Sequence, residues 1–179
     1  MAPLRREPFL GDSPHDPHAR RMLDLLLAQD GSTTRLCETV AGGPVELHVV
    51  SQRPTRDIPE RVRALLPGGQ FIERITSLAA HGEVLMDNLG FIALDGLAPD
   101  IAADLLAGQL PIGHLLARMW VRREPLAAAH ELAAQLWAAV GQPDPAATRA
   151  YRIVTPEGAR MVIAETWRRG MLMDRHDRG

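Results

Sequence analysis

Lysine is absent from this chain, and all 20 basic residues are arginine. This absence excludes a Schiff-base lysine and the Gly-Lys-Ser/Thr phosphate-binding loop. Cysteine is nearly absent as well: Cys37 is the only one, which excludes an intrachain disulfide and a zinc site built on several thiolates. Cys37 lies within a predicted helix and has no histidine within several residues. We therefore interpret it as a packing residue rather than a nucleophile.

Long apolar runs are also missing. No segment approaches the ~20 apolar residues of a bilayer-spanning helix, and residues 1–8 lack the apolar core of a signal peptide. The net charge of −2 and the pI near 6.4 offer no general attraction to nucleic acid. The 46% apolar content and mean hydropathy of −0.09 indicate a globular protein. We expect a cytoplasmic monomer or small homo-oligomer without nucleic-acid or membrane partners.

The length of 179 residues is enough for one domain with a substantial core, which we place at residues 19–170. Residues 1–18 hold four prolines and two histidines without periodicity, which predicts a loose N-terminal arm. His15 and His18 have no third ligand nearby, so we predict no metal site in this arm. Residues 171–179 form a predicted C-terminal tail.

Hydrophobic periodicity predicts helices and strands throughout the domain. The apolar spacing is typical of helices at 20–28, 32–40, 99–106 and 126–140. Period-two alternation predicts strands at 45–49, 71–79, 84–92, 151–154 and 161–167, with hairpin turns at 81–83 and 155–158. In the first strand, Val45, Leu47 and Val49 are predicted to face inward. Strands in hairpins, interrupted by helices, predict an α+β domain with a central, mainly antiparallel β-sheet.

Two charged residues lie among apolar neighbours in these strands. Arg74 shares a strand face with Ile72, and Glu165 shares one with Ile163 and Trp167. A charge among core-facing side chains is costly unless it meets a partner or a ligand. The pair therefore favours a cavity that holds an anionic substrate at one end and acts on it at the other. The alternatives are a buried Arg74–Glu165 ion pair and an edge register in which both groups face water.

Four segments follow one another in an order that resembles a known family. They are Leu26-Leu27-Ala28-Gln29-Asp30-Gly31-Ser32-Thr33-Thr34-Arg35-Leu36, the Arg74 strand, the Pro111-Ile112-Gly113 turn and the closing Glu165 strand. Over roughly residues 20–170, this order is similar to that of the chorismate pyruvate-lyase (4-hydroxybenzoate synthase) superfamily. The resemblance implies a chorismate lyase-like fold, in which helices cover one face of the antiparallel sheet and enclose a small ligand cavity.

The resemblance also implies an activity and a set of site residues. Members of the superfamily remove the enolpyruvyl group of chorismate to give 4-hydroxybenzoate and pyruvate, with no metal or organic cofactor. By position, Arg74 matches the arginine that binds the ring carboxylate, and Glu165 matches the acid at the other end of the ligand. Thr33 and Ile112 match positions that contact the ligand, largely through backbone groups. An arginine fork suits carboxylate binding, and a buried carboxyl suits proton donation.

One position departs from the family pattern. The best-known branch carries a second arginine in a Gly-Arg-Thr context on the strand after the Arg74 strand, where this chain has Asn88-Leu89-Gly90. Leu89 in place of that arginine leaves the identity of the substrate open. Arg123 and Arg149 are candidates to supply the missing charge, and Asn88 is a candidate hydrogen-bond donor. His114, beside the Ile112 turn, is either an acid or base of the site or a histidine on a helix surface.

Three functions fit these features. The first is a cofactor-independent lyase acting on chorismate or a close relative. The second is a small-molecule-binding module, because the same fold serves as the effector-sensing domain of bacterial transcription regulators. The residues before position 19 are too few for the DNA-binding helix-turn-helix of such regulators, which favours the enzyme. The third is a diverged enzyme that acts on another aryl or polyketide-like carboxylate in a biosynthetic pathway, for which the missing arginine is the best support.

Overall fold

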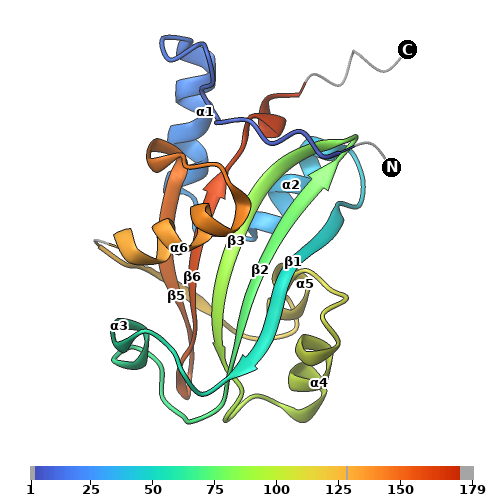
Figure 1. The fold of residues 1–179 in the computed structure, drawn as a ribbon. Helices are drawn as coiled ribbons and strands as arrows, with labels where there is room; N and C mark the ends of the chain where they lie inside the picture. The colour runs from blue at the N-terminus through green and yellow to red at the C-terminus, as the bar shows by residue number, and fades with distance from the viewer. Residues whose placement is uncertain (1–2, 128, 174–179) are drawn as a thin grey trace.

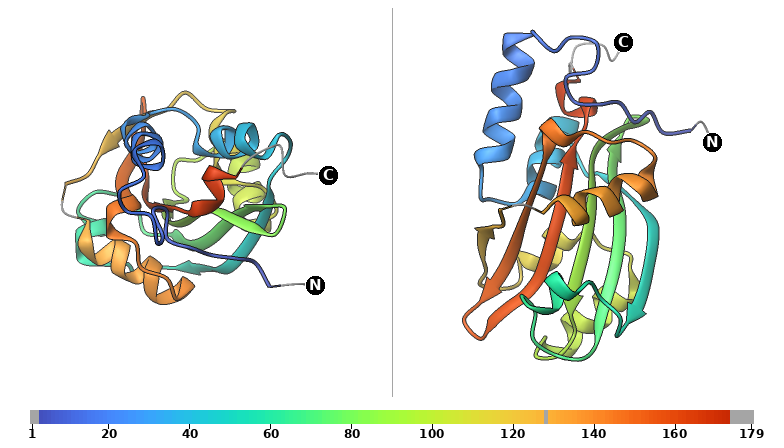
Figure 2. Two further views of the ribbon diagram at one scale, coloured as in Figure 1. Left: turned by 90° about the horizontal axis from the view of Figure 1, so that it is seen from above. Right: turned by 60° about the vertical axis from the view of Figure 1, so that its left-hand side comes forward.

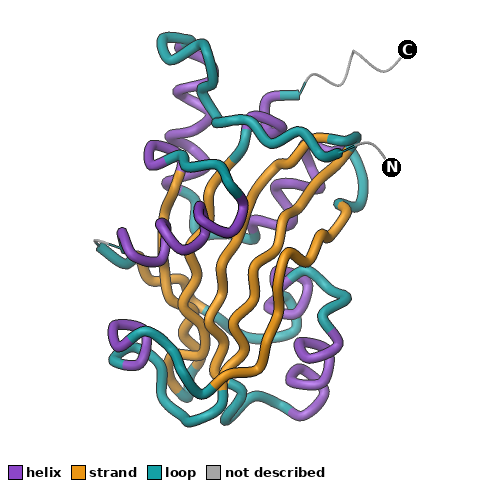
Figure 3. The backbone as a smooth tube through the Cα atoms, in the orientation of Figure 1, coloured by secondary structure: helices purple, strands orange, loops and turns teal. Residues whose placement is uncertain are grey.

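A six-stranded antiparallel sheet forms the centre of the computed structural model, which describes residues 3–127 and 129–173 (Figure 1). The strand order is β1-β2-β3-β6-β5-β4, so the β2–β3 hairpin and the β5–β6 hairpin meet at the β3–β6 pair. The strands are β1 (Glu46–Thr55), β2 (Phe71–Ala80), β3 (Glu83–Ala93), β4 (Arg122–Pro125), β5 (Thr148–Thr155) and β6 (Gly158–Trp167). The predicted α+β class with an antiparallel sheet is confirmed, and the course of the strands is followed most easily in Figure 3.

Helices lie on both faces of the sheet, whereas the sequence predicted them on one. They are α1 (Pro17–Ala28), α2 (Thr33–Ala41), α3 (Glu60–Arg63), α4 (Pro99–Ala107), α5 (Ile112–Leu116), α6 (His130–Val140) and the 3-10 turns η1 (Pro145–Ala147) and η2 (Arg169–Leu172). In Figure 1, α6 crosses in front of the strands and α2 lies behind them; the view from above in Figure 2 places these two helices on opposite sides. Among the described residues, no helix has both the length and the apolar character required to span a membrane.

The central strands are buried on both faces, which explains their long apolar runs. On one face, Ile72, Ile92 and Ile163 pack against Leu105 of α4 and Leu115 of α5. The other face belongs to a separate cluster, in which Ile75, Leu89, Phe91 and Val162 pack against Val62 of α3 and Leu132 and Leu136 of α6. The first of these faces carries the candidate site, and we call it the cavity face.

Two predicted elements have different bounds in the structure. The first strand is longer than predicted and is interrupted by a bulge between Val49 and Ser51, which leaves Val49 45% exposed rather than inward. The helix predicted from residue 126 begins at His130, and residues 122–125 before it form the edge strand β4. The backbone N–H of Leu126 continues this pairing by donating to the carbonyl of Ala150.

The N-terminal arm packs onto the sheet, so the prediction of a loose arm over residues 1–18 is wrong for its described part. The backbone N–H of Arg5 donates to the carbonyl of Gly82, and Arg6 Nε lies 3.1 Å from Asp87 Oδ2. Phe9 is fully buried, and its backbone N–H donates to Asp144 Oδ2. These partners lie more than 70 residues away in the sequence, where local composition carries no signal of them.

The predicted C-terminal tail is also partly packed. Met171 is buried in the cluster formed with Phe9, Trp167 and α1, whereas residues 174–179 lie outside the described residues. The packed unit therefore extends beyond residues 19–170 at both ends.

Candidate ligand-binding site

A small cavity lies on the cavity face between the sheet, α2 and α5. Its free volume of about 20 Å³ admits a water molecule but no ring. Its walls come from α2, α5 and the strands, and its lining residues are Thr33, Thr34, Leu47, Thr76, Leu78, Met86, Asn88, Pro111, Ile112, Gly113, Leu116, Arg123, Tyr151 and Ile163. Thr33 and Ile112, both predicted to contact a ligand, therefore line one cavity.

The roof of the cavity depends on the close approach of α2 and α5. Ser32 caps α2 by accepting a hydrogen bond from the backbone N–H of Arg35, which sets Thr33 and Thr34 in the first turn. A Cβ on Gly113 would lie only 2.2 Å from Thr34 Oγ1. Glycine is thus required at position 113 for the two helices to meet at this distance.

The register of four strands sets the order of the side chains on the cavity face. Arg74 of β2, Gly90 of β3, Ile163 of β6 and Tyr151 of β5 are successive cross-strand partners and form one row. Directly opposed residues project from the same face of an antiparallel sheet. The row therefore places Arg74 and Tyr151 at its two ends, with a glycine and an isoleucine between them.

A second row runs parallel to the first. It contains Thr76, Asn88, Glu165 and Arg149 in that order. The register thus brings Arg74 and Glu165 to the same face of the sheet, as the sequence predicted, and adds Arg149 directly opposite Glu165.

Arg74 is a fully buried cation without an anionic partner among the described residues. Its Nη2 donates to the carbonyl oxygens of Gly108 and Leu110 at 3.1 and 2.9 Å. Its Nε and Nη1 are buried and have no hydrogen-bond partner among those residues. Burial lowers the pKa of the Arg74 guanidinium from its ordinary value, because desolvation disfavours the charged form. Two guanidinium nitrogens, with three N–H bonds between them, therefore remain for an acceptor that the described residues do not supply.

Glu165 is also fully buried, but both of its carboxyl oxygens are occupied. Oε1 accepts a hydrogen bond of 2.7 Å from Arg149 Nε, and Oε2 accepts one of 2.9 Å from the hydroxyl of Tyr151. Burial raises the pKa of Glu165 above its ordinary value, while Arg149 and Tyr151 oppose that shift. The alternative of an Arg74–Glu165 ion pair is therefore wrong, since the partner of Glu165 is Arg149.

Arg149 and Arg123 connect this end of the site to the corner between α1 and α2. Arg149 Nη1 donates to the carbonyls of Leu27 and Gln29, and Arg123 Nη1 donates to the carbonyl of Asp30. Their guanidinium carbons lie over the ring of Tyr151, at 5.3 Å for Arg149 and 5.8 Å for Arg123. Each retains a buried nitrogen without a partner among the described residues, Arg149 Nη2 and Arg123 Nε. Two cations therefore flank the end of the row opposite Arg74.

Comparison with known proteins identifies the family of this chain. Residues 27–173 match the family described as chorismate pyruvate-lyase Rv2949c-like. The chain belongs to this family. No curated protein matches the chain.

Two of the solved structures that are similar to this chain are domains of bacterial regulators. One is the ligand-binding domain of a GntR-family regulator from Bordetella bronchiseptica, with 18% identity, coverage of 70% of this chain and 83% of that chain, and a TM-score of 0.41. Another is the C-terminal domain of the histidine utilization repressor from Pseudomonas syringae pv. tomato, with 14% identity, coverage of 69% and 91%, and a TM-score of 0.43.

Leu89, the position that departs from the lyase pattern, lies on the face of the sheet opposite the cavity. Leu89 pairs with Ile75 and Ala164 on the face covered by α6, so it does not face the cavity. The position at which the family pattern has its second arginine therefore lies outside the cavity. The cavity-facing neighbours on β3 are Asn88, whose buried Oδ1 has no partner among the described residues, and Gly90, which lies opposite Arg74.

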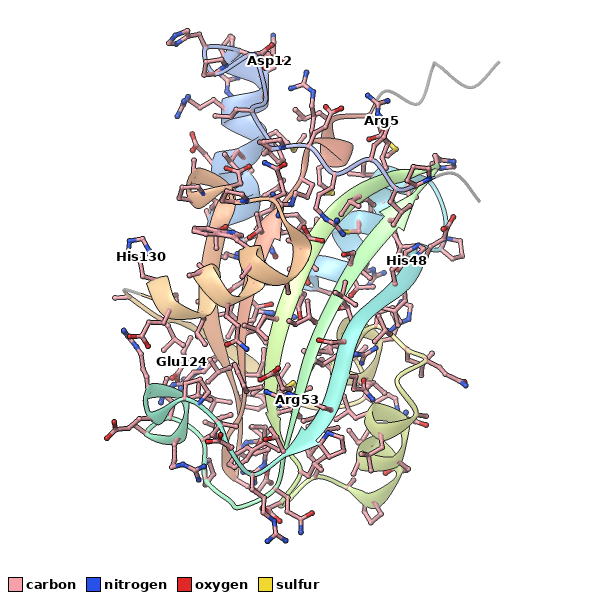
Figure 4. The ribbon with its side chains drawn as sticks, viewed as in Figure 1. Arg5, Asp12, His48, Arg53, Glu124 and His130 are labelled. Carbon is pink, nitrogen blue, oxygen red and sulfur yellow. The ribbon has the colours of Figure 1, made fainter. Side chains whose placement is uncertain are left out.

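His114 and His130 lie at the surface. His114 Nε2 is 2.8 Å from Glu38 Oε1, and the His114 side chain is 45% exposed, which matches the helix-surface alternative rather than an acid or base in the cavity. His130 at the start of α6 points away from the sheet (Figure 4). Within the described ranges, no three His, Cys, Asp or Glu side chains cluster as a metal site would require.

Sequence reasoning missed Tyr151 as a site residue. Its signal was present, because Arg149 and Tyr151 are two positions apart on a strand and must share a face. The chemistry of the site thus comes from two ends of the cavity face: the unpaired Arg74, and the group formed by Glu165, Tyr151, Arg123 and Arg149.

Proposed function

We propose that the protein is a cofactor-independent lyase that converts chorismate, or a close relative of chorismate, into 4-hydroxybenzoate and pyruvate. The observation that carries this proposal is Arg74, a buried guanidinium with two nitrogens that have no acceptor among the described residues. A buried cation without a counter-ion is costly, and a substrate carboxylate offsets that cost through charge-assisted hydrogen bonds. Membership of the chorismate pyruvate-lyase family supports the same reading.

Glu165 is the proposed acid of the reaction. Its carboxyl is buried and its pKa is raised, so it holds a proton more readily than an exposed glutamate. The reaction breaks the bond between a ring carbon and the enolpyruvyl oxygen; the ring loses one proton and the released enolpyruvate gains one. Formation of the aromatic ring supplies much of the driving force, so positioning and modest acid-base assistance suffice.

The remaining predicted site residues take supporting roles in this proposal. Arg123 and Arg149 supply positive charge for the enolpyruvyl carboxylate and replace the charge of the second arginine that this chain lacks. Thr33, Ile112 and Asn88 form the walls next to the ring.

Binding a ring requires the cavity to widen, since neither Arg74 nor Glu165 lines the present cavity of about 20 Å³. Arg74 is held by two carbonyls of the connection between α4 and α5, and Ile112 Cδ1 lies 3.4 Å from the Cβ position of Gly90. We therefore expect residues 108–112 to shift when the ligand enters.

The lyase proposal is tested by incubating the purified protein with chorismate and measuring 4-hydroxybenzoate and pyruvate by mass spectrometry. We expect both products in equal amounts, unaffected by EDTA, and strongly reduced with Arg74→Met. Product that disappears on chelation and returns with added metal contradicts the cofactor-independent mechanism. Absence of product from a folded protein contradicts the lyase activity itself.

A small-molecule-binding module is the second candidate. The observation that favours it is that each Glu165 oxygen accepts a hydrogen bond from a neighbouring side chain, Arg149 or Tyr151, as in a carboxylate with a structural role. This candidate predicts tight binding of 4-hydroxybenzoate without turnover of chorismate. A diverged enzyme also predicts no turnover of chorismate. Mass spectrometry of any carboxylate retained through purification distinguishes the diverged enzyme from the binding module by identifying the substrate or product of the enzyme.

A further inference from the structure

We infer that a second pocket, separate from the ligand cavity, binds a small molecule that carries a phosphate group, and that Arg160 holds this group. The pocket lies between the first turn of α4, the loop before it and the β5–β6 turn, and its free volume is about 340 Å³. That volume falls within the range of small-molecule sites, whereas the cavity described above admits only water. Among the described residues the two share no lining residue, so the inference goes beyond the lyase proposal and does not depend on it.

A bulge in β6 gives Arg160 its position. The register steps from the pair Val154–Ala159 to the pair Ile153–Met161, so Arg160 is the extra residue that has no partner on β5. An extra residue interrupts the alternation of side chains and re-aims them. In the structure, Arg160 is only 7% exposed and lines the pocket beside α4.

Arg160 is a buried cation whose guanidinium is largely unpaired. Its only hydrogen bond within the described ranges runs from Nη1 to the carbonyl oxygen of Ala159, at 3.3 Å. Nε and Nη2 have no partner in the described part of the chain and, unlike the free nitrogens of Arg74, they are not sealed from solvent. The guanidinium lies against Gly96, another lining residue, since a Cβ there would be 3.0 Å from Nη2 and 3.2 Å from Cζ. The unpaired nitrogens therefore face the pocket.

The unpaired edge of Arg160 is suited to an oxyanion. Nε and Nη2 together form the edge with which an arginine binds two oxygens at once. The same edge of Arg53 binds both oxygens of Glu73 in this protein, at 3.1 Å each. No carboxylate of the described residues takes that place at Arg160. An oxyanion in the pocket satisfies both nitrogens and offsets the cost of a buried charge.

The first turn of α4 provides a second feature suited to an anion. Ala98 is the N-cap and makes no side-chain hydrogen bond to the helix, so the N–H groups of the first turn keep their capacity to donate. Ala98, Asp100 and Ile101 line the pocket, and a helix N-terminus carries partial positive charge. A carboxylate has only the two oxygens that the arginine edge binds. A phosphate has further oxygens for these N–H groups, which favours a phosphate.

Two carboxylates at the same pocket oppose an anion and limit its affinity. Asp100 is paired with Arg118 at 2.5 Å, and Arg118 also contacts Asp104. Glu157 is exposed in the β5–β6 turn. Water screens these exposed charges more strongly than it screens the buried charge of Arg160, so the arginine dominates inside the pocket.

Apolar side chains also line the pocket, and they indicate what the phosphate is attached to. They belong to Leu97, Ile101 and Met119. Free phosphate leaves these side chains without a partner, whereas a phosphate ester with a small apolar group covers them. We therefore expect an ester to bind more tightly than free phosphate.

The test follows backbone amide NMR shifts of the ¹⁵N-labelled protein during titration with phenyl phosphate and, in parallel, with inorganic phosphate. Sodium chloride keeps the ionic strength constant. We expect saturable shifts at residues 96–101 and 157–160 with both probes, and a lower dissociation constant for phenyl phosphate. Arg160→Met should raise both dissociation constants by about 10- to 150-fold, the contribution of one charge-assisted hydrogen bond.

Two other variants serve as controls. Arg152→Met is the matched control, because it removes one positive charge from β5, leaves Glu124 paired with Arg122, and does not alter the lining of the pocket. It should keep the wild-type dissociation constant for phenyl phosphate. Arg74→Met removes the cation of the other cavity and should keep it as well.

The outcomes separate this inference from the lyase proposal, because none of them depends on turnover of chorismate. An Arg160→Met protein that binds phenyl phosphate like wild type overturns the inference. Binding that is lost in Arg74→Met and retained in Arg160→Met places the phosphate in the other cavity and also overturns it. Equal dissociation constants for the two probes overturn the assignment of an ester. If Arg160→Met does not fold, wild type decides: the absence of saturable shifts at residues 96–101 overturns the site.

Discussion

Replacing Arg74 with methionine distinguishes an arginine that binds a ligand from one that only supports the fold. Methionine keeps much of the length of the side chain and removes the charge. The substitution loses two hydrogen bonds to carbonyls, which are worth about 0.5–1.5 kcal/mol each. It also removes two buried nitrogens without partners among the described residues, each of which costs about 1–3 kcal/mol. Because these contributions oppose each other, we expect the free energy of unfolding without ligand to change by less than ~2 kcal/mol.

The effect of ligand should change much more. At a hundredfold excess of 4-hydroxybenzoate over its dissociation constant, wild type should gain about 2.7 kcal/mol, or roughly 5–11 °C in Tm for a domain of this size. Arg74→Met should lose most of this gain, because the carboxylate then lacks its cation.

Arg168→Met is the matched control, since Arg168 is the other fully buried arginine beside the core strands. Arg168 Nε donates to the buried carboxylate of Asp87 at 2.7 Å on the opposite side of the sheet. Without Arg168, the buried carboxylate of Asp87 loses one of its cationic partners. We therefore expect a loss of about 3 kcal/mol in the free energy of unfolding, with the ligand-induced gain retained. Urea unfolding and thermal melts of the three proteins, with and without ligand, measure both quantities. An Arg74→Met protein that is destabilised like Arg168→Met, yet still stabilised normally by ligand, refutes the assignment of Arg74.

Three further predictions concern the acid and the roof of the site. Glu165→Gln should lower kcat on chorismate by about 10²–10⁴-fold with little change in the affinity for 4-hydroxybenzoate, and unchanged turnover would remove Glu165 from the mechanism. The folded-state pKa of Glu165 is raised above the ordinary value of 4.5. Between pH 4.5 and this raised pKa, the native protein therefore binds more protons than the unfolded protein. The unfolding free energy of wild type should therefore fall relative to Glu165→Gln as pH rises above 4.5 toward the raised pKa; urea titrations showing a constant difference would contradict this. Gly113→Ala should cost about 1–3 kcal/mol and weaken ligand binding, because its Cβ would overlap Thr34, and a variant with normal stability and affinity would show that α2 and α5 adjust freely.

The local part of this structure follows from the sequence. Alternation of apolar residues predicted β2, β3 and β6, and the Thr155–Gly158 turn predicted the β5–β6 hairpin. The same alternation placed Arg74 and Glu165 on apolar strand faces, which was enough to select them as candidate site residues. These inferences succeed because turn chemistry and side-chain direction within one strand depend only on neighbouring residues.

The relation between strands was decided only by the tertiary structure. The period of two shows that Leu89 and Asn88 face opposite sides, but the pairing of Arg74 with Gly90 determines which of them faces the cavity. In the same way, Glu165 meets Arg149 and Tyr151 instead of Arg74 because β6 lies between β3 and β5. The N-terminal arm is held by Asp87 and Asp144, partners that exist only after the sheet and α6 have come together. Register and long-range packing depend on contacts between residues far apart in the chain, and for that reason local patterns could name the charged residues of this site but not their partners.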